Sequence, residues 1–173
     1  MTEEVILVNS DDEVIGTMEK LEAHRRGVLH RAFSVFIIND RNEMLLQQRA
    51  PEKYHSGGLW TNACCSHPRP GEPLAEAAIR RLQEEMGIRC ALHNIFHFTY
   101  KATFDNGLSE YELDHVFVGH YSEAPHPDPT EAISWKFRPL DAIRLDLAQH
   151  PEHYTHWFRI AFERVCAYLL QQQ

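Results

Sequence analysis

The stretch Ser66–Ile88, SHPRPGEPLAEAAIRRLQEEMGI, decides the fold of this chain. Apolar residues recur every four positions in its second half, at Leu74, Ala78, Leu82 and Met86. This spacing places them on one face of a helix, and Gly87 directly after them is a typical helix stop. We therefore predict an amphipathic helix between Pro73 and Met86 whose apolar face lies against a core.

The segments before this helix have the composition of strands. Val5–Val8 and Phe33–Asn39 are rich in β-branched and aromatic residues. The Asp40–Glu43 turn then leads from Phe33–Asn39 into Met44–Arg49. These two segments predict a β-hairpin.

Beyond the helix, the chain predicts further strands and a terminal helix. Ile95–Thr103 and Tyr111–Tyr121 are strand-like, and the residues Asp105–Gly107 between them favour a tight turn. Ser134–Phe137 adds a short strand, and Pro151–Leu170 contains an amphipathic helix. Its inward residues are expected to be Trp157, Ile160, Ala161 and Val165. This order of elements indicates one α+β or mixed α/β domain over residues 1–173, arranged as a sandwich.

The composition limits the classes of ligand. The 173 residues carry a net charge of −8, which disfavours broad attraction to nucleic acid or to an anionic membrane, so a phosphate-bearing ligand should be small. The 12 histidines invite a metal site. Because a signal pattern, a membrane-length apolar run and a secreted cysteine framework are all missing from the sequence, we expect a reduced, cytoplasmic protein.

The predicted helix and the residues beside it also contain side chains that could bind a metal ion. Polar and small residues stand there at fixed spacing: Glu72, Arg80, Glu84, Glu85, Gly87 and Ile88. The pattern resembles the Nudix box, a loop–helix–loop motif that in its family holds divalent cations against a diphosphate. Adjacent carboxylates at a helix end can bind Mg²⁺, although a solvated acidic helix end has the same composition. Ser66 stands where the family has glycine, and Arg81 replaces a glutamate, which disfavours ordinary Nudix hydrolysis.

The segment just before the helix gives a narrower resemblance. Residues 60–68, WTNACCSHP, together with Glu110 and Glu112, resemble the type I isopentenyl diphosphate isomerase family, and the similarity extends from about Val5 to the C-terminal helix. It implies a Nudix-like α/β/α sandwich with a mixed central sheet and a role in isoprenoid biosynthesis. The implied reaction protonates the alkene of isopentenyl diphosphate and removes a proton from the resulting carbocation, which gives dimethylallyl diphosphate.

The resemblance also implies a metal site made of His24, His30, His67, Glu110 and Glu112. Side chains two apart in a strand leave the same face of a sheet, so Glu110 and Glu112 can reach one ion. His24 and His30 are six apart and need a turn between them to converge. Nitrogen and oxygen ligands suit Zn²⁺ or Mn²⁺. Each histidine alone reads more simply as a surface or hydrogen-bonded residue, and the other nine, His55 included, receive no assignment.

The catalytic residues implied by the resemblance are Cys65 and Glu112, with the Tyr100 phenol beside that carboxylate. An acid and a base are needed on opposite faces of the five-carbon unit, shielded from water. Trp157 matches an aromatic residue that can stabilise positive charge, although a core position on its helix is an equal alternative. Cys64 is expected to be a small buried side chain.

The resemblance places the diphosphate on four cations, Lys20, Arg49, Lys53 and Arg81, with Mg²⁺ bound through Glu85. The expected partner is therefore a small molecule rather than nucleic acid or membrane, bound by a monomer or homodimer. The alternative function is a Nudix hydrolase of a nucleoside diphosphate or another diphosphate. A third class, a non-catalytic metal- or phosphate-binding module, would not need Cys65.

Overall fold

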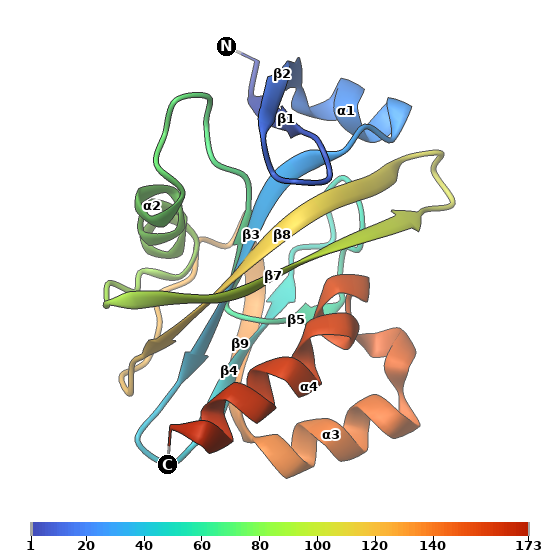
Figure 1. Ribbon diagram of the computed structural model, residues 1–173. Helices are drawn as coiled ribbons and strands as arrows, with labels where there is room; N and C mark the ends of the chain where they lie inside the picture. Colours follow the sequence, from blue (N-terminus) through green and yellow to red (C-terminus); the bar gives the residue numbers. More distant parts are fainter. Residues whose placement is uncertain (1, 173) are drawn as a thin grey trace.

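Nine strands form one sheet, with helices on both of its faces, in the computed structural model, which describes residues 2–172 (Figure 1). In chain order the elements are β1 (Glu4–Val8), β2 (Val14–Glu19), α1 (Lys20–Arg26), β3 (His30–Ile38), β4 (Glu43–Arg49), β5 (Trp60–Thr61), β6 (Cys64–Ser66), α2 (Leu74–Met86), β7 (Leu92–Thr103), β8 (Ser109–His120), β9 (Ala132–Pro139), α3 (Leu140–Gln149), the 3-10 turn Pro151–His153 and α4 (His156–Gln171).

Strand β3 is the centre of the sheet. It pairs in parallel with β8 along its whole length, from His30 opposite Glu112 to Ile38 opposite His120. Its other edge pairs antiparallel with β1 at its start, with β6 in its middle and with β4 at its end. The sheet is therefore mixed, as predicted, and β3 connects the strands that carry most of the candidate site.

The two faces of β3 belong to two different cores. Its residues alternate between them, because successive side chains of a strand point to opposite faces. Phe33, Val35 and Ile37 pack under α2, whereas Phe36 and Ile38 pack with α4. Figure 1 shows α2 on one side of the sheet and α3 and α4 on the other. This arrangement confirms the α/β/α sandwich.

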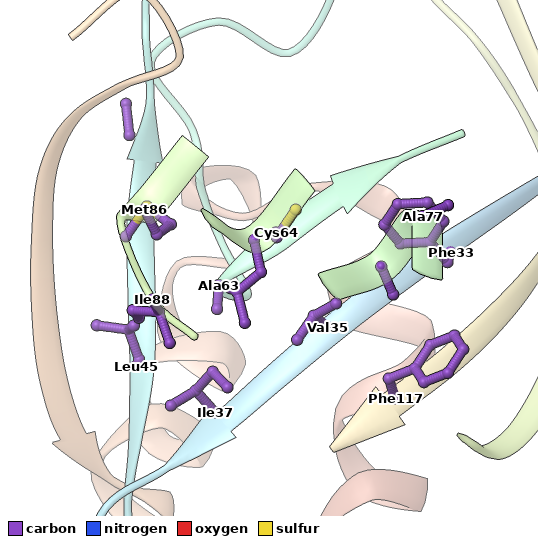
Figure 2. Packing of buried hydrophobic residues seen from close by; sticks show 13 residues of the cluster. Phe33, Val35, Ile37, Leu45, Ala63, Cys64, Ala77, Met86, Ile88 and Phe117 are labelled. Atoms are coloured by element: carbon purple, nitrogen blue, oxygen red, sulfur yellow. The ribbon is translucent and has the colours of Figure 1, made fainter. Parts of the chain in front are cut away.

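Helix α2 ends where the sequence predicts. Gly87 adopts a left-handed conformation with φ 64°, and its N–H donates to the carbonyl of Gln83. A Cβ at Gly87 would lie 2.9 Å from the carbonyl oxygen of His126, so both the backbone angle and the close approach require glycine. The buried face of α2, which includes Ala77 and Met86, covers the cluster shown in Figure 2.

One predicted core residue is wrong. Ile160 is 49% exposed, whereas Trp157, Ala161 and Val165 are buried as expected. The buried stripe of α4 also includes Phe158. At 100° per residue this stripe is centred between positions 157 and 158, which turns position 160 to the solvent side.

The predicted strands lie at the positions of observed strands, but most of them begin later than the observed ones. Residues 95–103 and 111–121 correspond to β7 and β8, which form one long hairpin, and residues 134–137 lie inside β9. The predicted hairpin of β3 and β4 exists, but it pairs only at Ile38 and Met44 among the described residues, and β4 pairs mainly with β9. The sequence prediction missed β2, α1, α3 and the short strands β5 and β6.

Candidate active site

A pocket of about 150 Å³ opens at the end of the sheet where β3 begins. Most of the predicted site residues line it: Lys20, Arg49, Lys53, Cys65, His67, Arg81, Glu110, Glu112 and Trp157. Residues without a predicted role also line it, among them Glu3, Tyr54, His55, Ser66, Asp114 and Glu131. Chain segments that are far apart in the sequence therefore meet in one small polar cavity.

Three histidines converge on Glu112 beside this pocket. Helix α1 ends at Gly27, and this turn lets His24 and His30 face each other with ring centroids 5.0 Å apart. His30 stands opposite Glu112 in the β3–β8 register, and its Nε2 lies 3.1 Å from Glu112 Oε2. His67 follows β6 and places its Nε2 2.6 Å from the same oxygen. The turn predicted between His24 and His30 is thus present.

The donor set of this cluster fits a divalent metal ion. One ligand atom from each of His24, His30, His67 and Glu112 lies within 4.8 Å of the others, and all four residues are buried. His24 Nδ1 donates to the carbonyl of Lys20 at 2.7 Å, and His30 Nδ1 donates to the carbonyl of Val28 at 2.9 Å. Such bonds on one ring nitrogen fix the tautomer and leave Nε2 as a ligand, as in metal-binding histidines generally.

Glu110 lies beside this cluster but groups with different residues. Its nearby ligand atoms belong to His24 and His55. The Tyr100 hydroxyl contacts the carboxylates of both Glu110 and Glu112, and its distance to Glu112 Oε1 is 2.5 Å. Tyr100 therefore connects the two glutamates, and the sharing of one ion by all five predicted ligands stays a prediction.

The charges of the cluster follow from burial and from mutual contact. Burial alone would raise the pKa of Glu112, but the neighbouring side chains of His30 and His67 hold that pKa well below its usual range. Burial and the neighbouring His67 lower the pKa of His24 to about 3, so this imidazole stays neutral. Burial and the two nearby glutamates raise the pKa of Tyr100, which keeps its proton. An ionised carboxylate and a neutral imidazole are the forms that bind metal ions.

Cys64 and Cys65 point in opposite directions from β6. Cys65 lines the pocket, whereas Cys64 is fully buried in the core under α2, where its thiol contacts Glu85 Oε2 at 3.3 Å (Figure 2). Burial, and then the carboxyl of Asp114, raise the pKa of the Cys65 thiol, so it is protonated at neutral pH. The structure thus separates the two cysteines as the resemblance implied.

A single buried amide holds the pocket wall together. The Oδ1 atom of Asn62 accepts from Cys65 Sγ at 3.3 Å, from Trp157 Nε1 at 3.1 Å and from Thr61 Oγ1 at 2.8 Å. Its Nδ2 donates to the carbonyls of Val35 and Cys64. Asn62 therefore fixes a candidate catalytic thiol and the Trp157 ring relative to each other, a role that the sequence prediction missed.

The predicted diphosphate-binding cations all reach the pocket, and acidic groups neutralise most of them. Lys53 Nζ lies 2.5 Å from Glu131 Oε2, and Arg81 Nη2 lies 3.2 Å from Glu131 Oε1 and 3.0 Å from Glu85 Oε2. Lys20 pairs with a glutamate of the N-terminal segment, Glu3, at 2.7 Å. An anion that enters the pocket would have to share these cations with their present partners.

Arg49 and Glu85 occupy distinct places in this network. The Arg49 guanidinium lies 5.2 Å from the centroid of the Trp157 ring and donates to the carbonyl of His55. Glu85 is buried at the end of α2, behind Arg81, and burial raises its pKa although Arg81 opposes this. The predicted Mg²⁺ ligand thus adjoins the cations rather than the histidines.

Asp114, His55 and Glu131 are among the pocket residues that had no role in the sequence prediction. Asp114 continues the alternation of Glu110 and Glu112 along β8, so the period of two could have revealed it. Burial, and then the charge of Glu112, raise the pKa of Asp114, and its Oδ2 accepts from Ser34 at 2.8 Å. His55 and Glu131 come from loops, and a single sequence carries no spacing signal for them.

The NUDIX domain family matches residues 28–158 of the chain. A protein of Pectobacterium atrosepticum named isopentenyl-diphosphate Delta-isomerase is 52% identical over 165 residues, which are 95% of this chain and 92% of that protein. A protein of Aromatoleum aromaticum named isopentenyl-diphosphate Delta-isomerase 1 is 50% identical over 167 residues, or 96% of this chain and 94% of that protein.

Solved structures share the fold at low identity. A crystal structure of a Deinococcus radiodurans protein has a TM-score of 0.79 at 17% identity and covers 94% of this chain and 98% of that one. The structure of a MutT protein from Methanosarcina mazei has a TM-score of 0.66 at 24% identity, covering 79% of this chain and 91% of that one. At these identities the likeness concerns the fold alone.

Proposed function

The chain belongs to the isopentenyl-diphosphate Delta-isomerases within the NUDIX domain family, and we propose that its polar pocket converts isopentenyl diphosphate to dimethylallyl diphosphate. The observation that carries this proposal is the placement of Cys65 and Glu112 in one pocket. They come from β6 and β8, which pair with opposite edges of β3. This placement suits an acid and a base on two sides of a small substrate.

The proton shift needs two groups that exchange protons with different carbons. One group adds a proton to the terminal methylene, which leaves a tertiary cation, and the other removes a proton from the carbon next to the CH₂O group. The Cys65 thiol keeps its proton in the buried site, and the Tyr100 hydroxyl contacts Glu112 at 2.5 Å. We assign the two proton transfers to Cys65 and to the Glu112–Tyr100 pair.

The walls of the pocket support a cationic intermediate. Trp157 is 3% exposed, and its indole N–H bond to Asn62 holds the ring at the pocket. An aromatic face stabilises a desolvated cation by about 2 kcal/mol or more. The Arg49 guanidinium lies 5.2 Å from the centroid of that ring.

The metal centre is proposed to involve His24, His30, His67, Glu110 and Glu112, with Zn²⁺ or Mn²⁺ as the ion. Such an ion, with Mg²⁺ near Glu85, would supply positive charge that fixes the carboxylates and neutralises the diphosphate. Lys20, Arg49, Lys53 and Arg81 would then bind the phosphate oxygens. The hydrocarbon end is left for the part of the pocket that Cys65 and Trp157 line.

Two features favour isomerisation over hydrolysis of a nucleoside diphosphate. Arg81 bonds to Glu85 at the position where the Nudix box has a further glutamate, so that carboxylate ligand is replaced by a cation. The pocket volume of about 150 Å³ is also small. Typical ligand pockets measure about 300–1,000 Å³, so this one suits a five-carbon diphosphate better than a nucleotide.

The function is tested by incubating the protein with isopentenyl diphosphate and Mg²⁺ in heavy water. We expect deuterated dimethylallyl diphosphate, because the added proton comes from groups that exchange with solvent. No phosphate should be released. Release of phosphate without alkene isomerisation would select the hydrolase instead, and mass spectrometry with a phosphate assay reads both outcomes.

We also propose a cellular location and an oligomeric state. In the part of the chain that the structure describes, every helix is too short or too polar to cross a bilayer. The four cysteines are free thiols, which supports a reducing, cytoplasmic setting. The proposed unit is one domain that acts as a monomer or as a homodimer.

A further inference from the structure

A second cavity lies between β9, α3 and the segment that leads into α4. Its volume is about 240 Å³, compared with about 150 Å³ for the candidate active-site pocket. The two cavities share none of their lining residues, and the residues that line the second one are Lys136, Arg138, Ala142, Ile143, Asp146 and Tyr154. We call this cavity the β9–α3 pocket. The isomerisation proposed above gives it no role.

Two cations on β9 line this pocket together. Lys136 and Arg138 are two apart in the strand, so their side chains leave the same face of the sheet. The residues that alternate with them, Trp135 and Phe137, pack against the core under α2 on the opposite face. The register of β9 therefore brings an ammonium and a guanidinium to one small cavity.

No carboxylate neutralises these two cations. In the part of the chain that the structure describes, the lysine and arginine side chains that form ion pairs are those of Lys20, Arg31, Lys53, Arg80, Arg81 and Arg144. Burial, and then the charge of Arg138, lower the pKa of Lys136, and Asp146 opposes this only in part. An anion bound between the two cations would offset their mutual repulsion.

The carboxylate that lines the pocket already has another partner. Asp146 Oδ2 accepts a hydrogen bond from the hydroxyl of Tyr154. Burial and this bond raise the pKa of Tyr154, so the phenol keeps the proton that it donates. Tyr154 and Ile143 are each 1% exposed and form the inner wall of the pocket. Two positive side chains therefore stand against one negative side chain, which leaves the pocket with a net positive charge.

The Lys136 side chain is held in place before any ligand binds. Its Nζ atom lies 4.1 Å from the centroid of the Trp60 ring. Trp60 is itself fixed, because it pairs with Gln48 of β4 and its carbonyl accepts from the N–H of Thr155 at 3.1 Å. A cation that is already positioned loses less conformational entropy when an anion binds, and this favours binding.

The first turn of α3 adds positive potential to the same pocket. Ala142 lies in that turn, and the N-cap residue Pro139 makes no side-chain hydrogen bond to it. The acidic residue of the turn, Asp141, pairs with Arg144 at 2.7 Å. The N–H groups at the start of a helix have no partners within the helix and attract anions. The helix therefore supports the charge that Lys136 and Arg138 supply.

We propose that the β9–α3 pocket binds a compact phosphate-bearing anion between the Lys136 ammonium and the Arg138 guanidinium. Two adjacent cations match the several oxygens and the double charge of a phosphate group better than the single charge of a carboxylate. The pocket volume of about 240 Å³ is below the range of about 300–1,000 Å³ that is typical of ligand pockets, so the ligand is small. Binding at this site does not depend on the reaction in the candidate active-site pocket.

Inorganic phosphate is the probe that tests this site. The protein labelled with nitrogen-15 is titrated with phosphate, and two-dimensional NMR locates the backbone amides that shift. Sodium chloride at equal ionic strength corrects for screening. The variants Lys136→Met and Arg138→Met keep an aliphatic side chain and remove one charge each. Arg41→Met removes the same charge from the exposed turn between β3 and β4 and is the matched control.

We expect saturable shifts at Ala142, Ile143 and Tyr154 in the wild type and in Arg41→Met. The affinity for phosphate at these amides should fall at least about tenfold in Lys136→Met and in Arg138→Met, because each variant removes one of two charge-assisted contacts. Acetate should bind at least about tenfold more weakly than phosphate, because it carries a single charge. The same spectra show whether each variant is folded, and Arg138 is exposed, so its replacement should be tolerated.

Three results would overturn the inference. Phosphate shifts confined to the residues of the candidate active-site pocket would place the anion there alone. Shifts at Ala142 and Ile143 that persist unchanged in both Lys136→Met and Arg138→Met would show that they are transmitted from another site. Equal affinity for acetate and phosphate would contradict the class of ligand. The assay with isopentenyl diphosphate is separate, so a failure here leaves the proposed isomerisation standing.

Discussion

Cys64 and Cys65 are adjacent in the chain and have different surroundings. Cys65 faces the pocket, and Cys64 lies in the core between β6 and α2. The alternation of side chains along a strand makes this separation unavoidable once β6 has formed, since two successive residues cannot share a face. The proposed catalytic thiol and a buried core thiol are therefore neighbours on one short strand.

Replacement of Cys65 by alanine should abolish isomerisation while the fold is retained. We expect turnover to fall at least about 1,000-fold, because a positioned acid or base contributes about 10²–10⁴-fold. Cys64→Ala is the control, and it should keep most activity but lose about 1 kcal/mol of stability through the small cavity it leaves. Turnover assays and thermal melts check both variants. A fully active Cys65→Ala enzyme would contradict the assignment.

Glu112 is proposed to act in chemistry and the basic residues in binding, and these roles can be separated. Glu112→Gln should reduce turnover at least about 1,000-fold, because the amide cannot exchange a proton as the carboxylate does. Binding of the diphosphate through Lys20, Arg49 and Lys53 should persist within a few-fold. Calorimetric titration with substrate measures this. If binding fell as far as turnover, the division of roles would be wrong.

Some of the residues that line the pocket could be predicted from the sequence, and others could not. The spacing of Glu110 and Glu112, and the WTNACCSHP segment, were enough to predict two carboxylates and a cysteine that line the pocket. His55 and Glu131 escaped prediction because each reaches the site from a loop. Their contacts are with residues 55 and 78 positions away, Glu110 and Lys53, and only tertiary structure sets such contacts.

At the scale of elements, the end of α2 is the most constrained junction. Gly87→Ala should destabilise the protein by about 2 kcal/mol or more, because a left-handed backbone and a close contact with His126 both oppose a side chain. Gly71 has φ +78° with open space around it, so Gly71→Ala should cost about 1 kcal/mol. Denaturant unfolding of the two variants measures the difference. Equal effects would mean that the His126 contact is unimportant.

The turn between β1 and β2 is expected to stabilise the fold in a pH-dependent way. Asp12 joins this turn to the sheet through Arg31 Nε at 2.8 Å and His115 Nε2 at 2.8 Å. Burial tends to raise the pKa of Asp12, but its bonds with Arg31 and His115 lower it. Because the folded pKa is below the unfolded value of about 3.9, the stabilisation is complete above that pH and is lost as the pH falls through the folded pKa.

Asp12→Asn tests this linkage. Asparagine tolerates the left-handed conformation of Asp12, φ 62°, so the substitution removes the charge with little backbone effect. We expect the variant to be less stable than the wild type at pH 7 and the difference to shrink below about pH 4. Urea unfolding at both pH values provides the comparison. A difference that stayed constant with pH would exclude a role for the charge of Asp12.

At the scale of the whole molecule, the elements that the sequence predicted poorly are those that depend on distant partners. Strands β5 and β6 have two and three residues, and they exist because β4 and β3 provide edges for them. Helix α2 was predicted almost to the residue because its period and its glycine stop are local. The fold class could be predicted from local signals such as the helical period and the glycine stop of α2. The full set of residues that line the pocket could not, because they come from distant segments of the chain.

Removal of metal should affect the whole molecule as well as its activity. A strong chelator should abolish turnover, and addition of Mn²⁺ or Zn²⁺ with Mg²⁺ should restore it. The melting temperature should fall on chelation, because an ion that binds only the folded state stabilises it. Calorimetry on the metal-free and reloaded protein checks this. Undiminished activity after verified metal removal would refute the metal centre.

The Asn62 oxygen accepts hydrogen bonds from both Cys65 and Trp157, and this has a consequence for the order in which the site forms during translation. Trp157 belongs to the last helix of the chain, whereas His24 and Lys20 belong to the first. During translation the histidine cluster can assemble once β8 has emerged from the ribosome, but the wall near Cys65 waits for α4. A nascent chain would therefore assemble the histidine cluster before it acquires a closed pocket, and the complete site would form only after α4 has emerged.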